Sequence, residues 1–213
     1  MSGQQSAEEV EAEHIAKLGP DLGPVYHALW NECAWLNVKW QQYQVLFGTS
    51  PEHIELLNHV APVFFRVVQD TLWEGILLAM CALTDPLRSV GKANLTVYRL
   101  SELTKESDPN FREELTEDIK AAREATEFAR DWRNRHIAHH DLALAVDAGA
   151  KPLEPASRKR VSAAINAVCN VLRKISLQYL ESDIVFGAFR EPGGAQALLC
   201  VLRDGLGVGE SLD

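Results

Sequence analysis

Apolar residues spaced three and four positions apart recur along most of this chain, and no other feature constrains its fold as strongly. One such face runs from Leu22 to Phe47, and another runs from Val161 to Tyr179. Residues at this spacing lie on one side of an α-helix, so each pattern predicts a helix with a buried face. Residues 63–83 are apolar on nearly all sides, which is typical of a central helix. The sequence therefore predicts an all-α bundle of four to five long helices.

Proline and glycine mark where these helices begin and end. Gly19 is expected to end a short first helix, and Pro51 occupies the first position of another. Pro62 is expected to kink or restart the chain. Pro109 begins what we expect to be the longest uninterrupted helix, reaching the histidines near residue 140.

The remaining segments are assigned from length and composition. Residues 141–155 form a long connector, and loops of this length are often functional or mobile. The glycine-rich tail after Arg203 is expected to be loose. We expect three parts: a flexible N-terminus or short helix at 1–20, a helical domain at 21–182 and a C-terminal extension at 183–213.

The composition predicts a cytoplasmic globular protein. Of the 213 residues, 46% are hydrophobic and 24% are charged, which are ordinary proportions for a soluble domain. The first residues lack the basic region and apolar run of a secretory signal, and charges interrupt the most apolar segment, so no membrane partner is expected. The four cysteines lie far apart in the sequence, which favours a reducing compartment.

The charge argues against general affinity for nucleic acid but leaves a local basic surface. A formal net charge of −9 opposes non-specific binding, which depends on neutralising phosphates. Residues 151–174 nevertheless hold six bases and one acid. Three of these bases, Arg158, Lys159 and Arg160, lie where a helix begins, and cations there oppose the helix dipole. The cluster is therefore either a footprint for an anion or a solvated patch.

The candidate site is the run of residues 128–141, in which arginines lead directly into three histidines. The apolar stripe of the preceding helix becomes charged at Arg133, His136 and His140. A buried unpaired charge is costly, so Arg133 must meet an acid, a subunit partner, a cleft or a bound anion. Guanidinium is the preferred clamp for phosphate, and imidazole titrates near neutrality. The segment therefore suggests acid–base chemistry on a phosphodiester.

Arg133 followed by Asn134, with His139 a few positions later, resembles the motif of the HEPN superfamily. That motif is an arginine, usually followed by a polar residue, and then a histidine. Three other stretches are similar to the abortive-infection AbiU branch of this superfamily, and they are Leu83-Thr84-Asp85-Pro86, Asn94-Leu95-Thr96 and Ala138-His139-His140-Asp141. The order of the expected helices resembles that branch over residues 25–180.

The resemblance implies an HEPN-like all-α dimer in which two motifs face each other in a cleft. Many members are metal-independent endoribonucleases that need no cofactor. A histidine deprotonates or orients the ribose 2′-hydroxyl, which attacks the adjacent phosphorus and leaves a 2′,3′-cyclic phosphate. Carried over by position, Arg133 is the phosphate clamp and His139 the base, while Asn134 orients the site and His140 is the reserve. The resemblance also suggests phage defence or a toxin–antitoxin system, with an antitoxin-like protein partner.

Basic residues around this centre are expected to contact the RNA. They are Arg130, Arg135, His136, Arg88, Lys92, Arg158, Lys159 and Arg160.

Three alternatives stay open. The protein can be a non-catalytic dimeric helical module that binds RNA or a partner protein. The histidines can simply cap the helix, with Arg133 paired to one of three acids, which are Asp70, Glu74 and Asp131. Lastly, His136 and His140 have the spacing of zinc ligands on a helix and Asp141 is adjacent, although there is no H-E-x-x-H and no third ligand can be named.

Overall fold

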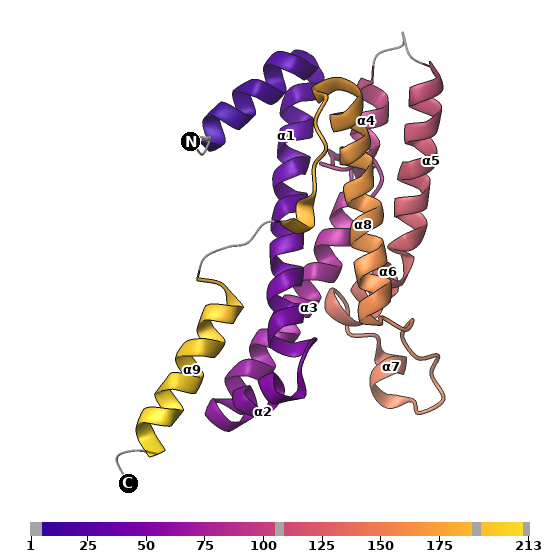
Figure 1. Ribbon diagram of the computed structural model, residues 1–213. Coiled ribbons are helices and arrows are strands. Elements are labelled where there is room, and N and C mark those ends of the chain that lie inside the picture. Colours follow the sequence, from indigo (N-terminus) through magenta and orange to yellow (C-terminus); the bar gives the residue numbers. More distant parts are fainter. Residues whose placement is uncertain (1–5, 105–108, 189–192, 211–213) are drawn as a thin grey trace. The chain divides into compact units, whose positions relative to one another are not determined.

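The computed structural model describes residues 6–104, 109–188 and 193–210, and most of these residues are helical (Figure 1). The prediction of an all-α fold is confirmed. The α-helices are α1 (Ala7–Phe47), α2 (Pro51–Val60), α3 (Pro62–Leu83), α4 (Tyr98–Leu103), α5 (Pro109–Ala125), α6 (Glu127–Trp132), α7 (Leu142–Val146), α8 (Arg158–Ile175) and α9 (Ala195–Glu210). Two π-helical turns, η1 (Arg133–Ile137) and η2 (Ser176–Leu180), extend α6 and α8, and a 3-10 turn, η3 (Phe186–Ala188), follows. None of the described helices has the length and apolarity needed to cross a bilayer.

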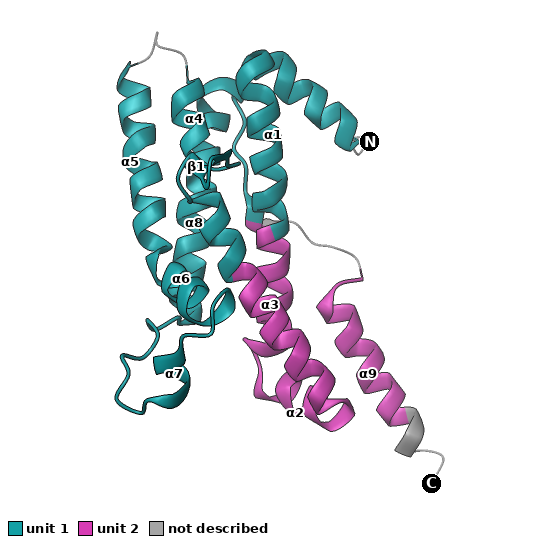
Figure 2. Ribbon diagram, turned by 180° about the vertical axis from the view of Figure 1, so that it is seen from behind, with its two compact units in different colours: residues 1–35, 77–186 teal, residues 36–76, 187–213 magenta. Residues whose placement is uncertain are grey.

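The chain forms two compact units that alternate along the sequence (Figure 2). The first unit comprises residues 1–35 and 77–186, and the second comprises residues 36–76 and 187–213. Helices α1 and α3 therefore contribute to both units. The expected division at residues 20 and 182 follows chain order and stays a prediction. Of the expected flexible N-terminus, residues 1–5 lie outside the described residues.

In the first unit, α5 and α8 lie side by side (Figure 1). The predicted apolar faces are the ones that meet, because Leu115 and Ile119 of α5 are buried, as are Ile165 and Leu172 of α8. Full burial of each such side chain contributes about 1.5–3 kcal/mol. At the edge of this contact the Lys174 ammonium lies within 3.1 Å of carboxylates of α5, which leaves the charged groups outside the apolar seam.

The second unit has a core of its own. Leu46, Leu57 and Phe65 pack with Ala195 and Leu199 of α9. The tail after Arg203 was expected to be loose, and for residues 204–210 this prediction is wrong, because α9 continues to Glu210, while residues 211–213 lie outside the described residues. Helix α9 forms despite its glycines, each of which costs about 1 kcal/mol, and it buries Leu199 on one face.

The predicted break at Gly19 is confirmed as a sharp kink inside α1. Gly19 has φ 88° and ψ 173°, a conformation that glycine adopts without steric cost. The kink brings the first turns of α1 back towards the turns that follow it. A Cβ on Gly23 would lie 2.6 Å from the Ile15 Cα, and the Nδ1 atoms of His14 and His27 are 3.1 Å apart.

The long helix expected to run from Pro109 to the histidines is interrupted, so that prediction is also wrong. Helix α5 ends at Ala125, and Thr126 leaves helical geometry with φ −95° and ψ 4°. The Thr126 hydroxyl donates to the backbone carbonyls of Ala122 and Arg123, and such local bonds compete with helix continuation. Helix α6 then begins in a new direction.

We predict that Gly23→Ala destabilises the protein by about 1–3 kcal/mol, because the added methyl group overlaps the Ile15 backbone. The matched control is Gly75→Ala in α3, where an added Cβ meets nothing within 4 Å. It should stabilise by about 0.5–1 kcal/mol, the usual gain of alanine over glycine inside a helix. Urea unfolding measures both free energies. Equal effects from the two substitutions would contradict the close approach within α1.

Candidate functional site

The site is built around the Asp85 carboxylate, which lies between two arginines. Its Oδ2 accepts a hydrogen bond of 2.7 Å from Arg133 Nη1, and its Oδ1 lies 3.6 Å from Arg130 Nε. Asp85 belongs to the turn after α3, Arg130 to α6 and Arg133 to the π-helical turn η1. One carboxylate therefore joins two of the chain segments that carry the family resemblance.

Arg130 is a buried structural residue. Only 4% of it is exposed, and its guanidinium donates to the Thr84 carbonyl at 2.7 Å and to the Thr126 hydroxyl at 2.8 Å. The Thr84 and Thr126 hydroxyls are themselves 2.9 Å apart. A buried charge is tolerated only when it is paired and hydrogen-bonded, and these partners hold the two terminal nitrogens, while the Nε lies 3.6 Å from Asp85 without a hydrogen bond. The contact between Arg130 and RNA stays a prediction, and this burial does not favour it.

Arg133 is held by the same carboxylate but remains accessible. Its side chain is 27% exposed, and its Nε donates to the Asn134 amide oxygen at 3.1 Å. The alternative that paired Arg133 with another acid is wrong about the partner. Asp131 binds Arg135, and Asp70 binds Arg66 in the second unit.

The segment of residues 94–96 holds the Asp85 turn in place. The Thr96 hydroxyl contacts the carbonyls of Leu83 and Asp85 at 3.0 and 2.8 Å. The Asn94 amide donates to the Pro86 carbonyl at 2.7 Å. Residues 94–96 and residues 83–86, two of the stretches that carry the family resemblance, are therefore hydrogen-bonded to each other. These bonds fix Asp85 opposite the arginines. The sequence did not predict the structural roles of Thr84 and Asp85. The one feature that could have pointed to Asp85 is its position as an acid at the end of a helix.

The motif itself forms the π-helical turn η1 rather than the end of an α-helix. The Ala138 N–H donates to the Arg133 carbonyl at 2.8 Å, five residues back. Such wider turns are rare and occur frequently at functional sites. The α-helix α6 ends at Trp132 and the π-helical turn ends at Ile137, so the regular helical stripe predicted to run from Arg133 to His140 is not formed. His136, His139 and His140 are all exposed, as is Asn134.

Arg135 secures the connector instead of facing solvent as an RNA contact. Its Nε donates to Asp141 at 3.3 Å, and its Nη2 donates to the Lys151 carbonyl at 2.6 Å. Its Nη1 reaches Asp131 and the Pro152 carbonyl, both at 3.4 Å. Four of its donor contacts are therefore made within the protein, and its predicted role in RNA binding is not supported by this geometry.

The other basic residues of the prediction are spread over two elements. Arg88 and Lys92 are exposed on a short hairpin that pairs β1 (Arg88–Ser89) with β2 (Lys92–Ala93). Arg158 and Lys159 are exposed in the first turn of α8. Arg160 stacks over the Phe128 ring at 4.7 Å and donates to the Pro155 carbonyl, so part of its surface packs inside the unit.

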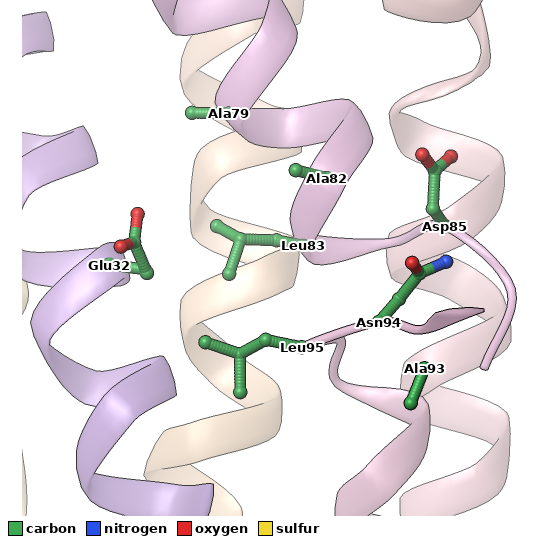
Figure 3. A pocket seen from close by; sticks show the side chains of 8 residues that line it. All are labelled: Glu32, Ala79, Ala82, Leu83, Asp85, Ala93, Asn94 and Leu95. Atoms are coloured by element: carbon green, nitrogen blue, oxygen red, sulfur yellow. The ribbon is translucent and has the colours of Figure 1, made fainter. Parts of the chain in front are cut away.

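A cavity of about 400 Å³ lies beside Asp85 (Figure 3). Its carboxylates, Glu32 and Asp85, lie on opposite sides of an apolar floor that includes Leu83 and Leu95. Like charges repel, so a cavity with two carboxylates does not suit a phosphate. An anion would therefore have to approach Arg133 from outside this cavity.

The chemical capacity of the site is the partly exposed guanidinium of Arg133 together with three exposed imidazoles, His136, His139 and His140, that follow it within seven residues of the sequence. No group of three or more histidine, cysteine or acidic side chains among the described residues is arranged to hold a metal ion. The zinc alternative at His136 and His140 consequently lacks a third ligand in that part of the chain.

Comparison with protein families gives one match. The family model HEPN_AbiU2, described as AbiU2, matches residues 20–198. No curated protein and no solved structure matches the chain.

We predict that three arginine substitutions differ sharply in their effect on stability. Arg130→Ala should cost about 3–5 kcal/mol, because it removes a buried charge and leaves its partners unsatisfied. Arg133→Ala should cost about 1–2 kcal/mol, the loss of one partly exposed charged hydrogen bond. Arg66→Ala is the control, since its exposed pair with Asp70 should contribute little. Thermal unfolding that ranks Arg133 above Arg130 would refute this assignment.

Proposed function

Because the chain belongs to the HEPN family AbiU2, we propose that it is a metal-independent endoribonuclease. Arg133 is the residue that carries this proposal. Its guanidinium is held by Asp85, and its side chain remains 27% exposed. Arg133 begins the π-helical turn η1, and His139, which follows this turn, has an exposed side chain. Phosphodiester cleavage needs a cation at the phosphoryl oxygens and a base at the attacking hydroxyl.

In the proposed reaction, His139 removes the proton of the ribose 2′-hydroxyl. The O2′ atom then bonds to the adjacent phosphorus as the bond from phosphorus to the 5′-oxygen breaks. The departing oxygen takes up a proton and becomes a 5′-hydroxyl, while the other product carries a 2′,3′-cyclic phosphate. Arg133 stabilises the charge on the non-bridging oxygens, Asn134 holds the guanidinium, and His140 is the reserve base.

The pairing of Arg133 with Asp85 is compatible with phosphate binding. A guanidinium has five N–H donors, and Arg133 uses two of them for Asp85 and Asn134 within the described residues, which leaves three. Arg130 lies on the other oxygen of the same carboxylate, and its Nη1 is also 3.9 Å from the Glu127 carboxylate. The remaining donors of the partly exposed Arg133 guanidinium, rather than a surplus of positive charge, would bind the phosphate.

We further propose that the protein acts as a homodimer with RNA as its substrate. An antitoxin-like protein that restrains the activity, and a role in phage defence, belong to the same proposal. The alternative is a non-catalytic helical module that binds RNA or a protein. The internal hydrogen bonds of Arg130 and Arg135 favour the protein-binding form of that alternative, because they leave fewer cations for RNA.

Cleavage of RNA in EDTA tests the proposal. His139→Ala should lower the rate by about 10²-fold or more. Arg133→Ala should lower it by about 10²-fold as well. The matched controls are His59→Ala and Arg66→Ala, exposed residues of the second unit that should leave the rate unchanged. The products should carry 2′,3′-cyclic phosphate ends, and an RNA with 2′-deoxy substitutions should resist cleavage.

Each contrary result has a distinct meaning. Failure of the wild-type protein to cut single-stranded and structured RNA would overturn the enzyme proposal, and retained RNA binding would then support the alternative. Cleavage that survives both active-site substitutions would place the activity elsewhere. Loss of cleavage in EDTA would favour a metal-dependent reaction.

A further inference from the structure

A second cavity, of about 470 Å³, lies where the motif turn meets the connector, and neither Arg133 nor His139 lines it. Small-molecule sites in proteins usually measure about 300–1,000 Å³. The motif turn and α7 supply one part of the lining, and residues 152–153, at the far end of the connector, supply the other. The residues that line it are Arg135, His136, His140, Asp141, Leu144, Ala145, Pro152 and Leu153.

The connector wall is held in place by hydrogen bonds to α6 and η1. The Asp131 carboxylate accepts the Glu154 N–H at 2.9 Å, and Trp132 Nε1 donates to the Glu154 carbonyl at 2.9 Å. Arg135 adds its bond to the Lys151 carbonyl. The connector expected to be functional or mobile is thus tied down at several points. A wall that is already ordered lowers the conformational cost of binding a ligand.

The wall formed by α7 is fixed from its first residue. The Asp141 carboxylate accepts the N–H groups of Ala143 and Leu144, at 2.9 and 3.3 Å, and also binds Arg135. The Leu144 N–H and the Arg135 guanidinium hold the pKa of Asp141 below its ordinary value, so this acid is ionised at neutral pH. Arg135 and Asp141 therefore bind each other and the backbone of the cavity walls.

Two imidazoles supply the remaining polar groups of the cavity. His136 lies edge-on to the Trp132 ring, with centroids 5.8 Å apart, and its centroid is 6.4 Å from that of His140. Both side chains are exposed, and the contacts that position the rings are aromatic. A neutral imidazole offers one donor and one acceptor, so each ring can bind a polar edge. Leu144, Pro152 and Leu153 surround them with apolar surface.

We propose that this cavity binds a nucleobase of the RNA, next to the phosphodiester held by Arg133. A nucleobase is flat, apolar on its faces and polar at its edges, which matches apolar walls combined with two imidazoles. Proteins that read single-stranded RNA stack bases on such side chains and hydrogen-bond their edges. His136 follows Arg133 by three residues within the same π-helical turn, so we assign the base and the phosphate to nearby positions of one strand. This inference rests on the proposed function. We assign the base selectivity of the proposed endoribonuclease to His136 and His140.

Binding of nucleotides to the intact protein tests the cavity without any cleavage. The probes are the four nucleoside 5′-monophosphates, with ribose 5-phosphate and inorganic phosphate as probes that lack a base. The imidazole proton signals of His136 and His140 are followed by NMR. At least one nucleotide should shift both signals and bind at least about tenfold more tightly than ribose 5-phosphate. Equal binding of ribose 5-phosphate, or no shift with any nucleotide, would overturn the proposal.

A pair of alanines on α7 supplies the matched variants. Ala145 lines the cavity, so Ala145→Trp should fill it and weaken nucleotide binding by at least about tenfold. Ala143 is exposed on the same helix and does not line the cavity, so Ala143→Trp should leave the affinity unchanged. Thermal unfolding of both variants verifies that they remain folded. Unchanged affinity in Ala145→Trp would exclude this cavity as the base site.

The cleavage pattern separates the two proposals. If RNA is cut, Ala145→Trp should alter which phosphodiesters are cut, while Ala143→Trp keeps the wild-type pattern. RNA cleavage without nucleotide binding in the cavity would overturn the base site and leave the endoribonuclease standing. Nucleotide binding without RNA cleavage would overturn the endoribonuclease and leave a base-binding site.

Discussion

The first unit depends on how the buried charge of Arg130 is neutralised. A guanidinium that is 4% exposed is stable only with partners on several sides, and these come from Thr84, Thr126 and Asp85. The end of α3 and the start of α6 must therefore approach each other. The same Asp85 carboxylate then holds Arg133 at the surface. Asp85 thus serves both the stability of the unit and the geometry of the candidate site. Residues 94–96 hold the turn that contains Asp85, so they influence both.

Much of the fold follows from the spacing of apolar residues. The buried faces of α1, α5 and α8, the kink at Gly19 and the breaks at the prolines are all visible in the sequence, because they arise from local geometry. The interruption at Thr126 and the length of α9 are not. The first depends on side-chain bonds that compete with the helix, and the second on contacts with α2, which is far away in the sequence.

The candidate site was predictable only in outline. The sequence indicates that Arg133 must meet an acid or an anion, but Asp85 lies 48 residues away and no periodicity connects them. Of the three neighbouring arginines, Arg130 is buried, whereas Arg133 and Arg135 keep 27% and 21% of their side chains exposed, and Arg135 directs its donors to the connector. The π-helical turn alters the angles at which these side chains leave the backbone, so counting along a regular helix could not sort them.

The central claim is that Arg133 meets the RNA backbone while its neighbour Arg130 holds the fold. Arginine Nε–H signals followed by ¹⁵N NMR test it directly, during titration with an RNA whose 2′-hydroxyls are methylated so that it cannot be cut. The signal of Arg133 should shift as RNA binds, and the signal of Arg130 should stay in place. An unmoved Arg133 signal at saturating RNA, or an equal shift at Arg130, would contradict the account.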